Sequence, residues 1–303
     1  MKRKVGISIP MFQRNFSDRR ALEIAKEIGA DCVDFCLDNY DIYDINRNGS
    51  LYQKSEEEII AYFSSLKEYS KELGIEISQT HGRGAGLKNI PEEDEILLKN
   101  LRLDCLATAA LGAPVCVIHN VTSIFMGPDP DPELMHRLSF ELFSKTIEFA
   151  KEYNIKIATE TFGDAVRFKA CDFFGNIDQF LMAYNKIKDT KELSDYICIC
   201  ADTGHSNKAT LYGNPSPADV IRMCGSDIKV LHLNDNDKLT DQHKTPYTGC
   251  IDWEDVFNAL DEIGYDGVYN MELDLKHFGE DFCIEEAAFA VKVLRHILDK
   301  RYC

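Results

Sequence analysis

One local pattern repeats along almost the whole chain and limits the folds available to it. An amphipathic helical segment ends, in most repeats at a glycine or asparagine, and a short run rich in β-branched residues or cysteine follows. The pattern predicts eight strands, at Val5–Ile9, Cys32–Cys36, Ile75–Thr80, Val115–Ile118, Ile155–Thr159, Ile197–Ala201, Ile228–Leu233 and Gly267–Leu273. It predicts eight helices, at Ala21–Gly29, Tyr62–Leu73, Leu97–Leu111, Phe140–Tyr153, Ile177–Leu193, Pro217–Met223, Trp253–Ile263 and Ile284–Leu298.

Strict alternation of strands and helices predicts parallel strands with right-handed crossovers, and eight such units predict a closed (β/α)8 TIM barrel of class α/β. No G-x-G-x-x-G sequence opens the first unit, which argues against an open dinucleotide-binding sheet. No linker rich in proline or serine divides the chain, so we predict a single barrel domain over residues 1–303.

The charge and the cysteines exclude several classes of protein. The chain has 34 Lys and Arg against 51 Asp and Glu, a net charge of −17, which argues against binding nucleic acid or an anionic membrane. The longest largely apolar run, residues 107–118, is too short to span a bilayer. The eleven cysteines form no C-x-x-C pair, and several lie in apolar runs. We therefore expect reduced, mostly buried thiols and a cytoplasmic location.

Six consecutive predicted strands end in a residue that can bind a metal or transfer a proton. In a TIM barrel the chemistry lies at the carboxyl ends of the strands, so these side chains should converge over the barrel mouth. Residues two and four positions earlier share a face with each strand end and are mostly small or branched, as a barrel interior requires. The strand ends are His81, His119, Glu160, Asp202, His232 and Glu272. The residues two and four positions before the ends of four of these strands are Val117 and Val115, Cys200 and Cys198, Val230 and Ile228, and Asn270 and Val268.

Carboxylates that converge without a cation would repel one another, so we predict a divalent metal ion at this mouth. Glu160, Asp202, His232 and Glu272 offer three carboxylates and one imidazole. This oxygen-rich set suits Mn²⁺, Co²⁺ or Mg²⁺ at least as well as Zn²⁺, because no thiolate is placed to favour zinc. We predict one ion, with Mn²⁺ as the first choice.

Two longer motifs extend this set and carry a resemblance to a known family. The first is Asp202-Thr-Gly-His205, and the second runs from His232-Leu-Asn-Asp235 through Asp241-Gln-His243 to Gly249-Cys-Ile-Asp252-Trp253, where Asp252 is a predicted helix N-cap. Together with Glu160 and Glu272, these motifs resemble the xylose-isomerase-like barrel superfamily over essentially the whole chain. That sugar phosphate isomerase/epimerase group includes inosose isomerases, ketose epimerases and, more distantly, endonuclease IV.

The resemblance implies an isomerase or epimerase that acts on a small sugar, polyol or inosose. The family's single metal then maps onto Glu160, Asp202, His232 and Glu272, and its acid/base pair onto Glu160 and Glu272. A metal that chelates a carbonyl and the neighbouring hydroxyl stabilises an enediolate, so that one glutamate can remove the proton between them and a glutamate can return it. The predicted substrate-binding residues are His81, His119, His205, Asp241 and His243, and the alternative for the four histidines is support of the metal ligands by hydrogen bonds. The sequence is compatible with a homo-oligomer.

Two features depart from the family's patterns. Ketose 3-epimerases of the superfamily carry a glutamate six residues after the strand-5 ligand and an arginine six residues after the strand-7 histidine, whereas this chain has Val166 and Lys238. These differences argue against a ketohexose 3-epimerase. The glycine-rich segment 81–86 lacks the ending of a P-loop, so we predict a mobile lid in which Arg83 is a candidate anion contact.

Three other functions remain open. A sugar dehydratase or a C-glycoside-cleaving lyase would use the same barrel and glutamates, and Phe12, Phe125, Phe162 or Trp253 would accept a flat aglycone unless they are core or lid residues. A metal-stabilised sugar-binding protein is disfavoured, because two strand-end glutamates exceed what binding requires. An endonuclease IV-like nuclease would hydrolyse phosphodiesters at three zinc ions, but the charge of −17 argues against it. Its ligand set matches His81, His119, Glu160, Asp202, His205, His232, Asp241, His243 and Glu272.

Overall fold

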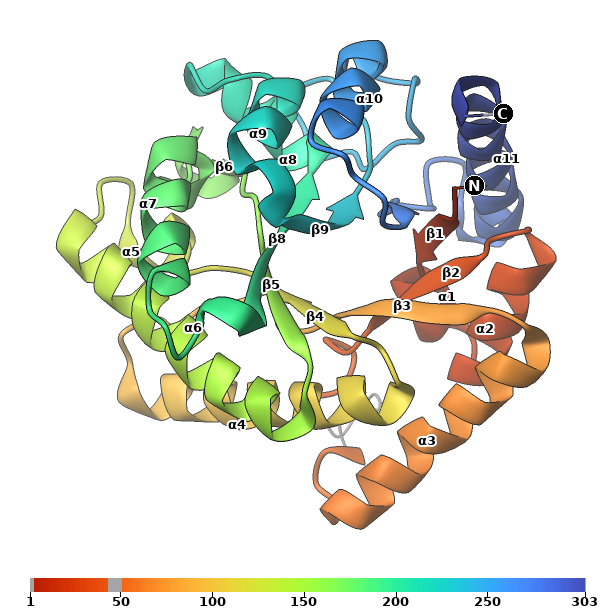
Figure 1. Cartoon of the computed structure of the whole chain (residues 1–303), viewed down its shortest axis with the longest axis horizontal. Coiled ribbons are helices and arrows are strands. Elements are labelled where there is room, and N and C mark those ends of the chain that lie inside the picture. The colour runs from red at the N-terminus through yellow and green to blue at the C-terminus, as the bar shows by residue number, and fades with distance from the viewer. Residues whose placement is uncertain (1–2, 43–50, 303) are drawn as a thin grey trace.

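Eight parallel strands form a barrel surrounded by helices in the computed structural model, which describes residues 3–42 and 51–302 (Figure 1). The order of the strands in the sheet is β10-β1-β2-β3-β4-β5-β8-β9, and a parallel bridge between Leu233 and Met271 connects its two ends. The predicted TIM barrel is confirmed. The strands are β1 (Val5–Ser8), β2 (Cys32–Cys36), β3 (Glu76–His81), β4 (Val115–Ile118), β5 (Lys156–Glu160), β8 (Ile197–Asp202), β9 (Ile228–His232) and β10 (Tyr269–Met271). The single-domain boundary stays a prediction.

The eight predicted helices are all present, but several begin earlier than predicted. Their first turns are polar and lack an apolar period, so only their caps mark them: Ser55 forms a capping box with Glu58, and the Asp131 side chain accepts a hydrogen bond from the backbone N–H of Glu133. These helices are α2 (Asp18–Glu27), α3 (Glu56–Leu73), α4 (Pro91–Leu111), α6 (Pro132–Tyr153), α7 (Ile177–Lys188), α9 (Pro217–Cys224), α10 (Trp253–Glu262) and α11 (Cys283–Tyr302).

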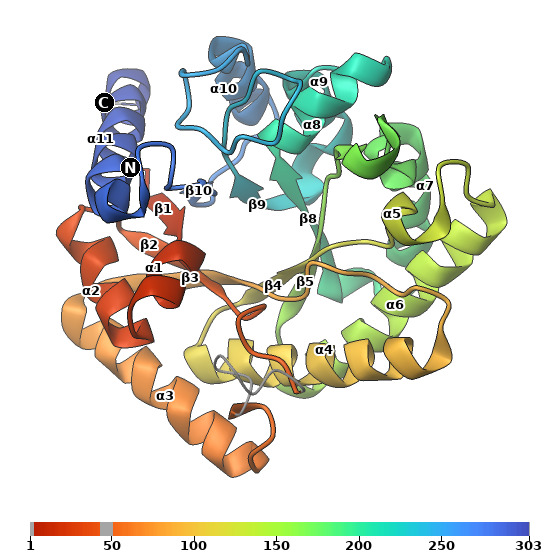
Figure 2. The same ribbon diagram turned by 180° about the vertical axis from the view of Figure 1, so that it is seen from behind.

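Three short helices and a two-stranded sheet, which the repeat does not predict, lie in segments that follow the barrel strands. Figure 2 shows the molecule from the end at which the strands finish, with the long connection between β9 and α10 in front. These extra elements therefore surround the mouth at which the predicted site residues lie. They are α1 (Pro10–Asn15), α5 (Ser123–Met126), α8 (Thr203–Ala209) and the antiparallel pair β6 (Asp164–Ala165) and β7 (Ala170–Cys171).

A small cluster of side chains fills the barrel interior, separate from the larger core between the strands and the helices. The residues of β4 and β8 that were predicted to face the interior do so, as does Val230 of β9. Ile228 of β9, which was also predicted to face the interior, belongs to the outer core. The reason is a register shift: Ile199 pairs with Ile228 and Cys200 with Val230, so β9 has one extra residue at this point. The interior cluster consists of Val115, Val117, Ala158, Cys198, Cys200 and Val230.

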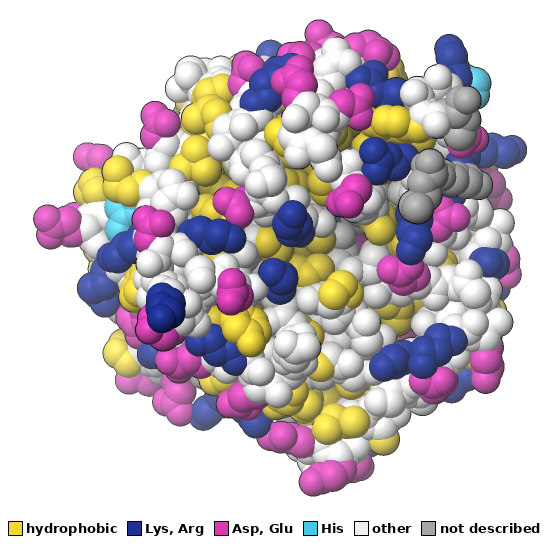
Figure 3. Space-filling model, viewed as in Figure 1, with side chains coloured by type: hydrophobic (Ala, Val, Ile, Leu, Met, Phe, Trp, Pro, Cys, Tyr) yellow, Lys and Arg dark blue, Asp and Glu magenta, His cyan; other side chains and the backbone are white. Residues whose placement is uncertain are grey.

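The thiols agree with the expectation of mostly buried cysteines. The described cysteines are free, and seven of the ten are buried. Lys and Arg side chains are interspersed with Asp and Glu over the face that Figure 3 shows. Within residues 3–42 and 51–302, none of the helices has the length and apolar character needed to cross a membrane.

The glycine-rich segment after β3 is fixed by packing, so the predicted role of Arg83 is wrong. Arg83 is 4% exposed. Its Nε and Nη2 donate to Asp104 at 2.9 and 3.1 Å, and Nη2 also donates to the carbonyl oxygen of Leu37. A Cβ on Gly86 would lie 2.6 Å from the Cα of Val121, so only glycine allows the backbone at position 86 to approach the backbone of Val121 this closely. The charge of Arg83 is already neutralised by a buried carboxylate, which leaves it no role as an anion contact.

The long connection between β9 and α10 is organised around Asp235. Its carboxylate accepts hydrogen bonds from the Trp253 indole at 2.7 Å and from the backbone N–H groups of Gly249 and Ile251 at 2.9 and 3.2 Å. The Asp252 side chain accepts from the N–H of Asp255, which confirms the predicted N-cap. Trp253 is therefore a core residue that holds this loop in place, and Phe12 of α1 is likewise a fully buried core residue.

Candidate active site

The six predicted strand-end residues all lie at the barrel mouth. Four of them are the last residues of β3, β5, β8 and β9, and the other two directly follow β4 and β10. One ligand atom from each of Glu160, Asp202, His232 and Glu272 lies within 4.8 Å of the others. We refer to these four residues as the tetrad. The structure thus brings together the predicted metal-binding set, although its role stays a prediction.

Glu160 is the centre of the site. It is completely buried, and one of its oxygens, Oε1, lies 3.2 Å from Nδ1 of both His232 and His205. The other oxygen, Oε2, lies 3.2 Å from Nε2 of His119 and 3.5 Å from Nε2 of His81. A single carboxylate therefore faces four imidazoles, three from the ends of β3, β4 and β9 and one from α8, the short helix that follows β8.

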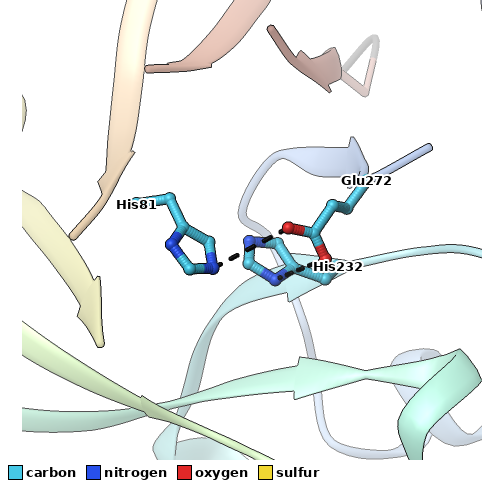
Figure 4. A group of neighbouring side chains, drawn as sticks. All are labelled: His81, His232 and Glu272. Atoms are coloured by element: carbon cyan, nitrogen blue, oxygen red, sulfur yellow. Dashed lines mark ion pairs between the residues drawn. The ribbon is translucent and has the colours of Figure 1, made fainter. Parts of the chain in front are cut away.

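Glu272 faces two of these imidazoles, those of His81 and His232, and also lines the cavity. Its Oε2 lies 3.4 Å from His232 Nδ1 and its Oε1 lies 3.7 Å from His81 Nε2 (Figure 4). The rings of His81 and His232 are nearly parallel, at 10°, with centroids 5.4 Å apart. The Glu272 side chain is 19% exposed, whereas that of Glu160 is fully buried.

Asp202 connects the tetrad to the first sequence motif. Its Oδ1 accepts a hydrogen bond from the backbone N–H of His205, so it is the N-cap of α8. Its Oδ2 accepts from the side-chain amide of Asn234 at 2.9 Å. A Cβ on Gly204 would lie only 1.8 Å from the Asn234 oxygen, which explains the glycine in Asp-Thr-Gly-His. The motif thus fixes a carboxylate and an imidazole on one short turn.

A second cluster adjoins the tetrad. Asp241 Oδ2 lies 3.6 Å from His205 Nε2 and 3.4 Å from His243 Nε2. Lys208, which is almost completely buried, lies 2.7 Å from the Asp164 carboxylate and 4.0 Å from Asp241. The sequence analysis did not single out Lys208, because a lysine inside a short polar helix gives no signal of burial.

The five predicted substrate-binding residues line one cavity of about 280 Å³, together with Glu272. This volume is just below the usual range for ligand sites, about 300–1,000 Å³, and most of the lining residues have polar or ionisable side chains, so the cavity suits a small molecule with several polar groups. Phe162 lies beside it, with its ring 5.3 Å from the His119 ring and stacked on His205 at 6.3 Å. Of the four aromatic residues considered from the sequence, Phe162 contacts this group of histidines, and Phe125 is 45% exposed.

Three further residues at the mouth were missed. Asp34 lies in the middle of β2, is fully buried and lines the cavity, and Ser8 of β1 and Gln79 of β3 donate hydrogen bonds to it at 2.9 and 3.2 Å. A signal was present, because an acidic residue between apolar neighbours in Cys32–Cys36 has no place in an ordinary barrel strand. The search for strand-end residues passed over it.

A family model described as xylose isomerase-like TIM barrel matches residues 22–293. The chain belongs to this family. Uncharacterized protein y4fM of Sinorhizobium fredii is 27% identical over 183 residues, which are 60% of this chain and 53% of y4fM. The match therefore spans about half the length of that relative. Uncharacterized protein MJ1311 of Methanocaldococcus jannaschii is 27% identical over 248 residues, 77% of this chain and 75% of that protein.

Several solved structures have the same fold, and each of them aligns with nearly the whole length of this chain. A D-tagatose 3-epimerase-like protein is 21% identical with a TM-score of 0.71, covering 99% of this chain and 100% of its own. The IolI protein with a zinc atom is 17% identical with a TM-score of 0.74, covering 99% of each chain. D-psicose 3-epimerase of Clostridium cellulolyticum H10 with D-tagatose is 17% identical with a TM-score of 0.73, covering 97% and 99%. At these identities the likeness establishes the fold.

The donor atoms of this family member fit a divalent cation. Among the described residues, both oxygens of Glu160 and Nδ1 of His232 are buried without a hydrogen-bond partner, although they lie close to one another. Buried polar atoms of this kind are costly unless something satisfies them. A cation between three carboxylates and one imidazole would satisfy all of these atoms. The tetrad is therefore the part of the site best suited to hold a metal.

The electrostatics agree with this assignment. Burial lowers the pKa of His81, but Glu160 and Glu272 outweigh it and raise the pKa to about 9. Burial also lowers the pKa of His243, but Asp241 and Glu272 outweigh burial and raise this pKa to about 9. Burial raises the pKa of Glu160, but the charges of His232 and His119 bring it well below its ordinary value. The carboxylates thus favour positive charge at this site, as they would favour a bound cation.

We expect the metal-free protein to lose stability between pH 6.5 and pH 9. An imidazole whose pKa is raised by folding stabilises the fold below its unfolded pKa, near 6.5, and this contribution is lost as the pH rises through the folded value. His81 and His243, with pKa values of about 9, set the window. The measurement is the melting temperature of chelator-treated protein at the two pH values. Equal melting temperatures would contradict the prediction, and metal-loaded protein, which needs no such protons, is the control.

Proposed function

We propose that this family member is a divalent-metal-dependent isomerase or epimerase of a small sugar, polyol or inosose, in which glutamates transfer a proton. The observation that carries the proposal is the position of Glu160 and Glu272. Their carboxylates belong to one tetrad within 4.8 Å, and Glu272 lines a cavity of about 280 Å³, lined mostly by polar residues, that is large enough for a small sugar. The structural likeness to a D-psicose 3-epimerase and a D-tagatose 3-epimerase-like protein supports the same class of substrate.

Glu160, Asp202, His232 and Glu272 would hold the metal. Mn²⁺ is the first candidate for this oxygen-rich set, and Co²⁺, Mg²⁺ and Zn²⁺ are alternatives. When bound, a divalent cation supplies electrostatic stabilisation for negative charge that develops on substrate oxygens. Glu272 of the tetrad lines the cavity, so oxygens of a substrate in the cavity would be near a cation held by these residues.

The proton transfer itself belongs to the glutamates. A carboxylate oxygen takes the proton of a substrate C–H bond next to a carbonyl, and an O–H bond on the glutamate replaces the broken C–H bond. The same or the other glutamate then returns the proton to a carbon, which gives isomerisation or epimerisation. Around the cavity, His81, His119, His205, Asp241 and His243 provide donors and acceptors for substrate hydroxyls.

The substrate is expected to lie outside the ketohexose 3-epimerase pattern. Val166, at the place of that group's second glutamate, is 63% exposed, so its side chain cannot replace a carboxylate in the site. Lys238 is at the place of the arginine, and a lysine cannot reproduce the planar contacts of a guanidinium. The substrate panel for the test below therefore contains inososes and other keto sugars in addition to the substrates of ketohexose 3-epimerases.

Proton exchange tests the proposal. The Mn²⁺-loaded protein is incubated in D₂O with a panel of ketoses and inososes, and NMR follows the loss of the C–H signal next to the carbonyl. We expect exchange with at least one member of the panel, followed by formation of an isomer or epimer. Exchange followed by loss of water or of an aglycone would instead indicate a dehydratase or a lyase. No exchange with any member would contradict the proposal.

A second candidate, phosphodiester hydrolysis, is favoured by one observation. Two further groups beside the tetrad, His81 with His119 and Glu160, and His205 with Asp241 and His243, have ligand atoms within 4.8 Å of one another. Together the three groups contain the nine residues that match endonuclease IV. Metal analysis discriminates between the candidates: three tightly held zinc ions per chain, with cleavage of abasic DNA, would favour the nuclease.

A further inference from the structure

A buried carboxylate on β2 lies behind the tetrad's histidine. Asp34 Oδ2 lies 3.1 Å from His232 Nε2, and both side chains are fully buried. Ser8 Oγ donates to the same oxygen at 2.9 Å and the Gln79 side-chain amide donates at 3.2 Å. Groups from β1, β3 and β9 therefore meet at one oxygen of a residue from β2.

The two ring nitrogens of His232 have different surroundings. Nε2 faces Asp34 and the Gln79 amide, at 3.1 and 3.2 Å. Nδ1 faces Glu160 Oε1 at 3.2 Å and Glu272 Oε2 at 3.4 Å, and it has no hydrogen-bond partner among the residues that the structure describes. A neutral imidazole has one N–H and one lone pair, so the nitrogen that carries the hydrogen decides which nitrogen can bind a metal.

Two arrangements are conceivable, and their energies differ. If Nε2 had the lone pair, Gln79 would donate to it, but the lone pair would then face a carboxylate oxygen 3.1 Å away. If Nε2 carries the hydrogen, it donates to Asp34 in a charge-assisted hydrogen bond, which is about twice as strong as a neutral one. The second arrangement also leaves the Nδ1 lone pair directed at the tetrad. Burial strengthens the preference, because a hydrogen bond is electrostatically stronger in the protein interior than in water.

We propose that Asp34 is a positioning residue that holds His232 as the tautomer with hydrogen on Nε2, so that Nδ1 is the metal-binding nitrogen. Ser8 and Gln79 in turn hold the Asp34 carboxylate in place. The inference rests on the metal site of the proposed function and adds to it the chemical state of one ligand. A carboxylate on the far nitrogen also makes an imidazole a stronger donor to a metal.

The first test reads the tautomer directly and needs no variant. Long-range ¹H–¹⁵N correlation spectra of protein loaded with one equivalent of zinc distinguish a metal-bound Nδ1 from a metal-bound Nε2. We expect His232 with hydrogen on Nε2 and zinc on Nδ1. Zinc bound through Nε2, or a His232 that does not bind zinc, would overturn the inference and leave the proposed function standing. A protein that binds no divalent metal would contradict the proposed function as well.

Two variants then separate Asp34 from Gln79. Asp34→Asn keeps the shape but removes the charge, and we expect about a 10- to 100-fold loss of zinc affinity, with a mixture of tautomers in the zinc-loaded spectrum. Gln79→Met removes the amide at similar size, and we expect the wild-type tautomer with at most about a fivefold loss, that of one hydrogen bond. The reverse result, with the tautomer changed in Gln79→Met and kept in Asp34→Asn, would assign the control to Gln79 instead.

Discussion

Glu160→Gln and Glu272→Gln are each expected to reduce the rate of substrate C–H exchange by about 10²- to 10⁴-fold. Glutamine has nearly the shape of glutamate, but its amide cannot take a proton from carbon near neutral pH. Deuterium exchange in the presence of Mn²⁺, with any substrate that the panel identifies, measures the effect. Undiminished exchange in both variants would show that neither carboxylate transfers the proton.

Both glutamates are also proposed metal ligands, so the experiment needs controls that separate the two roles. Asp202→Asn removes a ligand of the tetrad without removing a proton-transfer group. At saturating Mn²⁺ we expect Asp202→Asn to regain more exchange than either glutamate variant, because added metal can offset a weaker site but cannot replace a base. Glu285→Gln, on the exposed surface of α11, is the matched control and is expected to exchange at the wild-type rate.

Removal of the metal is expected to abolish exchange and to lower the melting temperature. A ligand present at about 100 times its dissociation constant stabilises the folded state by about 2.7 kcal/mol, which for a chain of this size is about 5 °C. The reason is specific to this site, since the unsatisfied oxygens of Glu160 and Nδ1 of His232 lose the cation that balances them. Chelation, dialysis and thermal unfolding measure both effects.

Re-addition of single metals completes this test. Mn²⁺ is expected to restore both exchange and melting temperature. The recovery obtained with Co²⁺, Mg²⁺ and Zn²⁺ ranks these three alternatives. Full exchange activity in protein shown by elemental analysis to hold no metal would contradict a metal-dependent mechanism. Restored melting temperature without restored exchange would mean that the cation is structural.

Much of the fold was predictable because it is encoded locally. Gly74, Gly112 and Asn154 adopt left-handed backbone conformations, with φ of 67°, 78° and 54°, and end their helices where the sequence predicts. Short runs of β-branched residues and cysteine predicted the strands, and the residue types at the strand ends predicted the position of the site. The polar first turns of α3 and α6 were missed, because they have no apolar period.

The errors concern contacts between distant segments. Arg83 was expected at a mobile lid, but it pairs with Asp104, and nothing near Arg83 in the sequence announces that partner. Ile228 was placed in the barrel interior, but a register shift against β8 moves it to the outer core. Neither the ion pair nor the shift leaves a local pattern in the sequence.

The sequence by itself determined the alternation of strands and helices, and with it the barrel and the set of side chains at its mouth. Residue types and their spacing carry that information, because strand parity and helix caps act over a few residues. Only the tertiary structure decided that Asp34 lies 3.1 Å from His232, a residue 198 positions away. That pairing depends on the closure and register of the barrel, and it selects which nitrogen of His232 faces the tetrad.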